Sequence, residues 1–350
     1  MLLSVVIPVY NEADALPSLF RALYPVLRSM DCKYELILVN DGSEDQTFQV
    51  LSNAAALDRQ VKVLGFSRNF GHQAAITAGI DFASGDAVVV MDADLQDPPE
   101  ILPEMFDLFR SGYDVVSAQR TQREGETIFK RATATMFYWV MERMVDERML
   151  PEVGDFRLFS RAAIVAIRNF REQHRFMRGL VAWLGLKEIV VPFRRHERSE
   201  GTTKYSTMKM LRFAWTAISS FSALPLRFSL VAGLFVALGG FVYLIYTLYA
   251  AIILRATVPG WTSLVALQVI FSGATLTAIG LLGDYVARIY EESKGRPLYV
   301  LGELINVRQP EGAIPRAIVL PARGLSVELV PPIVVSKNRE FEKVKHAGRA

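Results

Sequence analysis

The sequence contains a single cysteine, Cys32, among its 350 residues, and this excludes a framework of internal disulfides. It also carries little net charge, +3 at neutral pH, so the overall balance does not favour a nucleic-acid-binding protein. Hydrophobic residues make up 51% of the chain and charged residues 21%, a composition that excludes a wholly disordered protein. The length is sufficient for two or three domains.

Charged residues are missing from two long stretches of the C-terminal half. No Asp, Glu, Lys or Arg occurs at 229–254 or at 256–283. Because about 20 residues of helix cross the ~30 Å hydrocarbon core of a bilayer, we predict two transmembrane helices, at 229–254 and 263–283. The alternative is a buried helical hairpin in a soluble protein.

Basic residues near these stretches predict their orientation. Arg288, Lys294 and Arg296 follow the second stretch closely, whereas the loop between the stretches carries only Arg255. Since basic residues concentrate on the cytoplasmic side of a membrane, we predict that both ends of the chain are cytoplasmic. The residues after Met1 lack the basic segment of a signal peptide, so we expect the N-terminal part to stay on that side.

Residues 1–200 alternate short apolar segments with segments of helical pattern. Strands are predicted at 3–8, 35–40, 61–66, 87–91 and 115–118, and helices at about 14–30, 45–57, 72–83 and 99–111. This alternation is typical of an α/β domain with a mostly parallel sheet and helices on both faces. Such sheets bind ligands beyond the carboxyl ends of their strands, so polar residues at those positions are candidate site residues.

Candidate ligand-binding residues follow the first two predicted strands. Tyr10 and Glu12 come after the first strand, and Asp41 comes after the second. At adjacent strand ends, Tyr10 can stack on a nucleobase and the Asp41 carboxylate can accept hydrogen bonds from a base or ribose. The alternative for Asp41 is a structural role in a turn and helix cap.

Two further candidates follow the third predicted strand. Arg68 can reach an anionic ligand, or it can be a structural partner of Asp41 or Asp92. We interpret His72 as a residue of a helix start or of the core rather than as a catalytic one.

The fourth predicted strand ends in the sequence Asp-Ala-Asp-Leu-Gln. Asp92, Asp94 and Gln96 alternate along this segment, so in extended backbone their side chains fall on one side. Carboxylate and amide oxygens are the ligands that Mg²⁺ and Mn²⁺ prefer, and such a metal can hold a diphosphate. The alternative is an acidic surface turn before a helix.

Positive charge is concentrated directly before the two apolar stretches. Residues 157–212 contain 13 Arg or Lys and four Glu, an excess of nine positive charges that can attract anionic lipid headgroups or hold a phosphate. Nucleic-acid binding is the competing use of such a segment, which we discount beside a membrane anchor. Apolar residues at helical spacing in 205–227 predict an interfacial amphipathic helix; a buried core helix is the alternative.

Several segments resemble a known enzyme family. SVVIPVYNEADAL, LVNDGS and VVVMDADLQDPPE resemble the family 2 glycosyltransferases, which have the nucleotide-sugar-binding GT-A fold. GDFRLFSR (154–161), RFMRGLVAWLG (175–185), RSEGTTKYS (198–206) and SALPLR (222–227), before two apolar stretches, are similar to the membrane-anchored polyprenyl-phosphate glycosyltransferases. The resemblance covers about residues 2–300. Within that group, which includes the dolichol-phosphate mannose synthases, the bactoprenol glucosyltransferases resemble the chain most.

The resemblance implies roles for individual residues. The nucleoside pocket is formed by Pro8, Tyr10, Glu12, Asp41, Arg68 and Asp92. Asp94 and Gln96 bind the metal, Mg²⁺ or Mn²⁺. The acceptor phosphate and the diphosphate are bound by Arg120, Arg131, Arg198 and Lys204. Asp92, Asp94 and Asp155 are the catalytic carboxylates, and Asp155 is either a base or a group that orients the acceptor. The structural alternative for Asp155 is a helix cap or an ion pair with Arg157.

The resemblance also implies an activity and its setting. A single sugar, glucose from UDP-glucose, is transferred with inversion to the phosphate of undecaprenyl (bactoprenyl) phosphate at the cytoplasmic face of a bacterial inner membrane. Gln173 and Arg175 do not complete the Q-x-x-R-W motif of processive synthases, which favours single transfer. Membrane lipids, a flippase, a downstream glycosyltransferase and further copies of the chain are implied partners. Alternatives are another sugar, a non-lipid acceptor, or a non-catalytic subunit that binds sugar nucleotides.

The predicted organisation has four parts. A cytoplasmic catalytic domain at 1–204 is followed by the interfacial helix region at 205–227. A two-helix transmembrane domain at 228–286 precedes a cytoplasmic C-terminal tail at 287–350.

Overall fold

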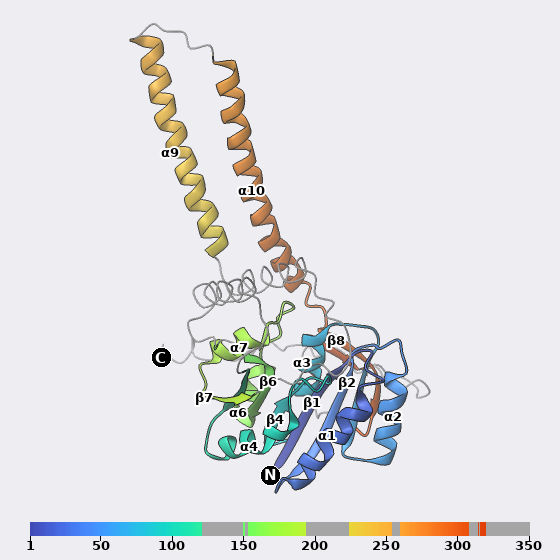
Figure 1. Ribbon diagram of the computed structural model, residues 1–350. Helices are drawn as coiled ribbons and strands as arrows, with labels where there is room; N and C mark the ends of the chain where they lie inside the picture. Colours follow the sequence, from blue (N-terminus) through green and yellow to red (C-terminus); the bar gives the residue numbers. More distant parts are fainter. Residues whose placement is uncertain are drawn as a thin grey trace, which may run out of the picture. The chain divides into compact units, whose positions relative to one another are not determined.

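The protein is described by a computed structural model, which covers residues 1–120, 150, 153–193, 224–253, 260–307, 314 and 316–319. Its strands are β1 (Leu2–Val9), β2 (Lys33–Asn40), β3 (Val61–Phe66), β4 (Ala87–Val90), β5 (Val115–Arg120), β6 (Val153–Ser160), β7 (Glu188–Phe193), β8 (Tyr299–Ile305) and β9 (Ala317–Val319). They form one sheet in the order β7-β5-β6-β4-β1-β2-β3-β8-β9 (Figure 1).

Most strand pairs of this sheet are parallel. The parallel pairs are β1 with β2, β1 with β4, β2 with β3, β5 with β7, and β8 with β9. β6 runs antiparallel to both of its neighbours, β4 and β5, and β8 runs antiparallel to β3. All five predicted strands are confirmed within two residues at each end. The predicted α/β class with a mostly parallel sheet is therefore confirmed.

Helices cover both faces of the sheet. α1 (Leu16–Ser29), α2 (Thr47–Leu57) and α4 (Leu102–Arg110) contribute to one core cluster, and α3 (His72–Phe82), α6 (Arg161–Arg168) and α7 (Met177–Leu184) contribute to the other. The four predicted helices are confirmed as α1, α2, α3 and a 3-10 turn at Pro99–Ile101 that leads into α4.

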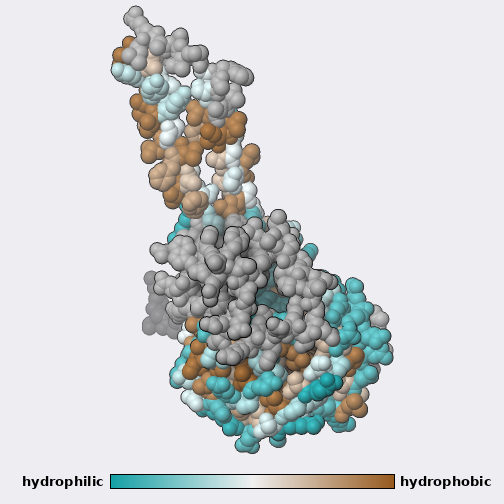
Figure 2. All heavy atoms as spheres, in the orientation of Figure 1, coloured by the Kyte–Doolittle hydropathy of each residue, from teal (hydrophilic) through white to brown (hydrophobic). Residues whose placement is uncertain are grey.

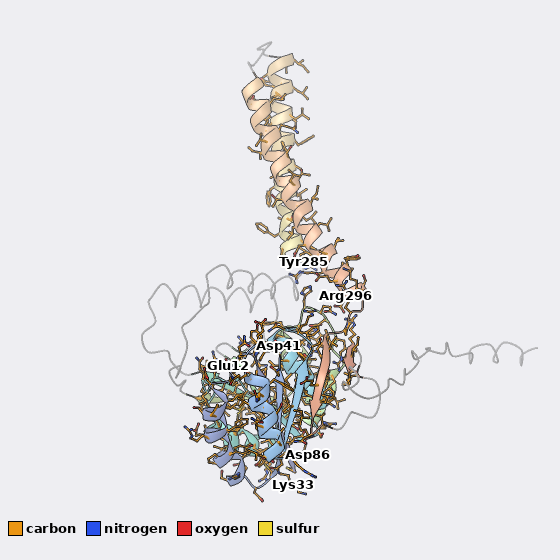
Figure 3. All side chains as sticks on the ribbon, turned by 90° about the vertical axis from the view of Figure 1, so that its right-hand side faces the viewer. Glu12, Lys33, Asp41, Asp86, Tyr285 and Arg296 are labelled. Carbon is orange, nitrogen blue, oxygen red and sulfur yellow. The ribbon has the colours of Figure 1, made fainter. Side chains whose placement is uncertain are left out.

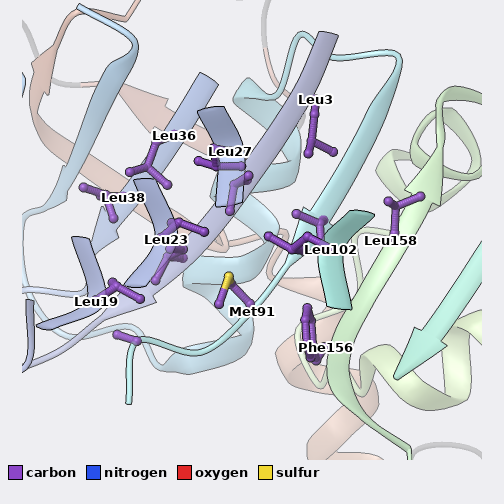
Figure 4. Close-up of a cluster of buried hydrophobic side chains, with 14 of the residues drawn as sticks. Leu3, Leu19, Leu23, Leu27, Leu36, Leu38, Met91, Leu102, Phe156 and Leu158 are labelled. Atoms are coloured by element: carbon purple, nitrogen blue, oxygen red, sulfur yellow. The ribbon is translucent and has the colours of Figure 1, made fainter. Parts of the chain in front are cut away.

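The spacing of leucines explains how α1 packs on the sheet. Leu16, Leu19, Leu23 and Leu27 recur every three or four residues and are all buried, as a helix requires for one apolar face. Figure 4 shows the last three of them in the core cluster. Each buried leucine stabilises the fold by about 1.5–3 kcal/mol relative to an exposed one. This packing fixes the end of β1, from which the first site residues project.

Two long apolar helices follow β7 in sequence. α9 (Leu224–Ile252) and α10 (Trp261–Ser293) contain the segments Pro225–Ala250 and Leu267–Ser293, which are long and apolar enough to cross a membrane. Their side chains are largely exposed, and Figure 2 shows them mostly in the colours of hydrophobic residues. The 33 residues of α10 extend about 50 Å, longer than the ~30 Å hydrocarbon core.

The chain returns to the sheet after α10. β8 pairs antiparallel with β3, and Tyr299 at its start is fully buried, stacked on Phe66 and hydrogen-bonded to Asp81. These residues lie within the predicted tail, so part of that segment belongs to the same sheet as the N-terminal strands. Of the predicted interfacial helix region at 205–227, only 224–227 fall within the described residues, where they begin α9.

Candidate active site

The carboxyl ends of β1 and β2 are joined by side-chain hydrogen bonds. The backbone nitrogen of Asn11 donates to Ser43 Oγ, and Asn11 Oδ1 accepts from the backbone nitrogen of Glu44 at 2.9 Å. Pro8 is buried within β1, whereas Tyr10 beyond it is 44% exposed and accessible to a ligand. Figure 3 shows Glu12 and Asp41 at the same end of the sheet, opposite Lys33 and Asp86. This end corresponds to the predicted ligand-binding edge.

Asp41 anchors the loop that follows β3. Its carboxylate accepts hydrogen bonds from the backbone nitrogens of Phe70 at 2.7 Å and Gly71 at 3.0 Å. Burial raises the pKa of Asp41, while these two bonds act in the opposite direction. Asp41 thus has a structural role in this loop; the nucleoside contact predicted for it is untested.

Gly42 permits a close approach between this loop and the turn after β2. Its φ is +66°, and an added Cβ would lie 2.4 Å from the backbone carbonyl carbon of Arg68. Arg68 itself is exposed, donates to the Asn69 carbonyl and lies 4.1 Å from the centre of the Phe70 ring. The Arg68 side chain therefore contacts neighbours in its own loop and remains accessible from solvent.

The segment after β4 folds back on itself as a tight turn. The Gln96 backbone nitrogen donates to Asp94 Oδ1, the Asp92 nitrogen donates to Asp97 Oδ2, and Leu95 has a φ of +57°. The turn replaces the extended geometry expected from the sequence. It still keeps the oxygens of Asp92, Asp94 and Gln96 within one short segment.

Gln96 fits the metal-ligand role predicted for it. Its side chain is buried, and its Oε1 atom has no hydrogen-bond partner among the residues that the structure describes. A buried amide oxygen is costly to leave unpaired, and a divalent cation bound beside Asp94 would satisfy it. Within the described part of the chain, no group of three or more His, Cys, Asp or Glu is placed to hold a metal. A metal here would thus combine Asp94 and Gln96 with oxygens of the substrate or water.

Asp155 lies at the start of β6, facing the end of β4. Because β6 runs antiparallel to β4, its first residues reach the carboxyl end of β4 and thus approach Asp92. Asp155 accepts a hydrogen bond from Gln73 Nε2 at 3.2 Å and pairs with Arg178 Nε at 3.3 Å. His72 Nε2 lies 3.5 Å from Asp155 Oδ2 and 3.6 Å from Asp92 Oδ1, so it bridges the two carboxylates.

The charges in this cluster shift the pKa values of Asp155 and His72 in opposite directions. Burial raises the pKa of Asp155, but the hydrogen bond to His72 and the Arg178 charge outweigh it and hold the pKa well below its usual range. Burial lowers the pKa of His72, but Asp155 and Asp92 outweigh this and raise it, favouring the imidazolium. Burial raises the pKa of Asp92. Asp155 is thus a stable carboxylate, better suited to orient its neighbours than to accept a proton.

Arg120 lies beside the same turn, on the β5 side. Its Nη2 is 3.8 Å from Asp97 Oδ1, and it approaches Gly154 at the start of β6. Burial and the Asp92 charge raise the pKa of Asp97 to about 7. The other predicted phosphate-binding residues, Arg131, Arg198 and Lys204, lie outside the described residues.

Gln73 and Arg178 were not predicted as site residues, and His72 was predicted to have only a structural role. His72 is the first residue of α3, as predicted, but its side chain faces the carboxylates. The ion-pair partner of Asp155 is Arg178 rather than Arg157, which lies 4.0 Å from Glu188. The position of His72 directly after a strand-ending loop was the available signal.

A short segment connects this cluster to the end of α10. The Gln173 nitrogen donates to Glu292 at 2.9 Å, and Gln173 Nε2 donates to the Arg296 carbonyl. His174 Nε2 lies 2.7 Å from Glu291 Oε2. The first residue of α7, Met177, donates to Gln73 Oε1 at 3.2 Å. The contacts thus run from α10 through 173–177 to Gln73, the hydrogen-bond donor to Asp155.

Comparisons with known proteins agree with this geometry. The profile described as glycosyl transferase family 2 matches residues 4–168. An uncharacterized glycosyltransferase of Bacillus subtilis, YkcC, is 44% identical over 85% of this chain and 92% of its own length. The bactoprenol glucosyl transferase of Shigella phage SfV is 38% identical over 86% of this chain and 98% of its own length.

Similarity to solved structures is weaker. A crystal structure of glucosyl-3-phosphoglycerate synthase from Mycobacterium tuberculosis, in complex with Mn²⁺, UDP-glucose and phosphoglyceric acid, is 16% identical with a TM-score of 0.44. The similarity covers 62% of this chain and 77% of that chain. At this level it says nothing of the ligands of the present chain.

Proposed function

Because the chain belongs to glycosyl transferase family 2, we propose that it transfers one glucose from UDP-glucose to the phosphate of undecaprenyl phosphate. The observation that carries the proposal is the set of relatives named bactoprenol glucosyl transferase, which are 36–38% identical over 86% of the chain. Their match is much longer than the family profile at residues 4–168 and so extends beyond the common catalytic part.

The two apolar helices support a lipid acceptor. We assign α9 and α10 as transmembrane helices that keep the catalytic domain at the membrane surface, where the phosphate of a lipid acceptor lies. Arg288, Lys294 and Arg296 at the end of α10 favour a cytoplasmic location for this end, and so for the catalytic sheet that β8 joins.

The donor nucleotide is assigned to the ends of β1 and β2. Exposed Tyr10 can stack on the uracil, while Glu12 and Arg68 line the same edge of the sheet. Buried Pro8 and Asp41 fix the backbone of this edge, because Pro8 lies in β1 and Asp41 holds the loop after β3. Asp92 is assigned to the ribose or the adjacent metal.

Asp94 and Gln96 would hold a divalent cation, Mg²⁺ or Mn²⁺. Such a cation supplies charge neutralisation to the departing diphosphate. On the protein side, the hydrogen bond from the Gln96 nitrogen to Asp94 fixes the orientation of that carboxylate within the turn. Arg198 and Lys204 are proposed to act on the same diphosphate.

The acceptor phosphate needs no strong base. Its second pKa is about 6, so it is largely a dianion at neutral pH and can attack the anomeric carbon of glucose directly. The bond between that carbon and the phosphate oxygen forms as the bond to the UDP oxygen breaks, and in-line attack inverts the configuration. Asp155 orients the site through His72 and Arg178, and Arg120 with Arg131 offsets the negative charge of the acceptor.

A donor panel tests this function. Membranes containing the protein would be incubated with undecaprenyl phosphate and, separately, with UDP-glucose, UDP-N-acetylglucosamine, UDP-galactose or GDP-mannose. We expect UDP-glucose to yield undecaprenyl phosphate glucose, and membranes carrying the Asp94→Ala variant to yield none of this product. The lipid assignment is wrong if no donor gives a lipid product, and the glucose assignment is wrong if another donor is preferred.

A further inference from the structure

Both oxygens of the Asp155 carboxylate are held by side chains from two different helices. Its Oδ2 atom lies 3.2 Å from Gln73 Nε2 and 3.5 Å from His72 Nε2, at the start of α3. Its Oδ1 atom lies 3.3 Å from Arg178 Nε, in the first turn of α7. The orientation of this carboxylate therefore depends on how the starts of α3 and α7 are placed relative to each other.

The Gln73 side chain joins these two helix starts. Its Oε1 atom accepts a hydrogen bond from the Met177 backbone nitrogen at 3.2 Å, while its Nε2 atom donates to Asp155. The orientation of the amide follows from its partners, because a backbone N–H only donates and an ionised carboxylate only accepts. Gln73 thus bonds both to Asp155 and to the residue directly before Arg178, the second partner of that carboxylate.

The Met177 nitrogen needs an acceptor from outside its own helix. Met177 is the buried first residue of α7, and the first backbone nitrogens of a helix have no partner within the helix. The preceding residue, Phe176, makes no side-chain cap. Because Gln73 supplies the acceptor that this cap position lacks, its hydrogen bond ties the start of α7 to the start of α3.

The two contacts of Gln73 require an amide. An ionised carboxylate at this position could accept from Met177 but could not donate to Asp155, and a hydrocarbon chain could do neither. Both polar atoms of the amide are engaged by protein groups. The geometry therefore suits a residue that acts through Asp155 and its partners.

We propose that Gln73 is a positioning residue for glycosyl transfer, which holds Asp155 and the start of α7 in the arrangement that pairs this carboxylate with Arg178. The inference rests on the proposed function, since it concerns the geometry that this transfer needs. Displacement of a catalytic group by about 1 Å can slow a reaction a hundredfold. Loss of the Gln73 contacts should therefore lower kcat rather than weaken the binding of UDP-glucose.

Two variants separate the two hydrogen bonds of this amide. Gln73→Met has a similar length and loses both. Gln73→Glu keeps the acceptor for Met177 but, when ionised, loses the donor and places a second carboxylate beside Asp155. The matched control is Gln60→Glu, which makes the same change at an exposed position directly before β3, at the opposite end of the sheet.

Sugar transfer would be measured with the full-length protein in phosphatidylcholine nanodiscs. We expect the kcat of Gln73→Met to fall about 10–100-fold, because its loss leaves Asp155 without a supporting partner. The KM for UDP-glucose should stay within about twofold of the wild-type value, which also shows that the nucleotide-binding edge is folded. The Gln60→Glu control should match the wild type in both constants.

The Gln73→Glu variant gives a result that a packing role would not. Asp155 would raise the pKa of the introduced carboxyl group, whereas the positive charges of His72 and Arg178 would lower it. Once protonated, the introduced group can donate to Asp155 and accept from Met177, as the amide does. Relative to wild type at the same pH, its kcat should thus rise as pH falls from about 9 to about 6, while that of Gln73→Met should stay constant.

Hydrogen exchange gives a readout that does not depend on turnover. In Gln73→Met, peptides covering the start of α7 should exchange roughly fivefold faster at the Met177 amide, as the loss of one neutral hydrogen bond implies. In Gln73→Glu this amide keeps its acceptor and should exchange like the wild type. Equal exchange in Gln73→Met and wild type would overturn the inference.

The kinetic outcomes separate this inference from the proposed function. If the wild type forms no lipid product with any donor, the proposed function is wrong, and the exchange of Met177 still decides whether Gln73 holds the start of α7. If the product forms while Gln73→Met keeps the wild-type kcat, the function stands and the positioning role is wrong. An identical response of both Gln73 variants to pH would also contradict that role.

Discussion

The buried carboxylate of Asp81 allows a quantitative prediction about β8. Asp81 accepts two hydrogen bonds from Arg171, at 2.7 and 2.8 Å, and one from Tyr299, at 2.7 Å. The Arg171 side chain is only 12% exposed. In the Asp81→Asn variant this guanidinium stays buried without its counter-charge, a change that costs about 3–5 kcal/mol.

Hydrogen exchange at β8 measures this cost directly. Because Tyr299 begins β8, weakening its partner lowers the free energy needed to open that strand. A loss of about 3 kcal/mol corresponds to more than 100-fold faster exchange, up to the limit set by global unfolding. The Tyr299→Phe variant loses one hydrogen bond to a charged group, about 1.5 kcal/mol, and should exchange roughly tenfold faster.

The matched control is Asp14→Asn, which makes the same chemical change at an exposed position. Peptides covering β8 would be followed by mass spectrometry in the detergent-solubilised full-length protein, with β1 peptides as internal reference. Unchanged β8 exchange in the Asp81 variant would refute the reasoning. An effect of Tyr299→Phe as large as that of Asp81→Asn would show that packing rather than charge stabilises the strand.

Three other perturbations give distinct results. Asp94→Ala should abolish glucosyl transfer, and full turnover with Mg²⁺ or Mn²⁺ present would refute the metal assignment. Gly42→Ala should lower the melting temperature more than Gly112→Ala, because both have positive φ but only Gly42 faces backbone within 3 Å; equal losses would contradict this. The pKa of Asp97 is raised to about 7, so the folded state keeps a proton that the unfolded state releases near pH 4. The free energy of unfolding therefore falls as pH rises from about 4 to about 7. Asp97→Asn should therefore raise the melting temperature relative to wild type more at pH 8 than at pH 5, and a difference independent of pH would argue against it.

Local patterns were sufficient to predict the first half of the sheet. Strands β1 to β4 are apolar segments whose side chains are largely buried on both faces, and each is followed by a helix that contributes buried residues to the core. Their ends placed Tyr10, Asp41 and Asp92 correctly at one edge of the sheet. The residues of this edge were thus accessible to reasoning from periodicity alone.

The second part of the site depends on long-range pairing. β6 enters the sheet antiparallel between β4 and β5, and this register brings Asp155 to Asp92 and to His72, 83 residues earlier in the chain. No local pattern in the segment GDFRLFSR indicates which strands of the sheet that segment pairs with. The same holds for β8, because the residues after α10 read as a tail until their pairing with β3 is seen.

The position of β8 imposes an order on biosynthesis. A ribosome makes β3, then both apolar helices, and only then the strand that covers the β3 edge. The roughly 240 residues from the end of β3 to the end of β8 take about 12–50 s to synthesise, during which that edge is open to pairing with other chains. With α9 and α10 in the membrane, as the proposed function requires, their insertion would precede completion of the sheet, and the folded domain would first exist at the membrane surface where that function places the acceptor.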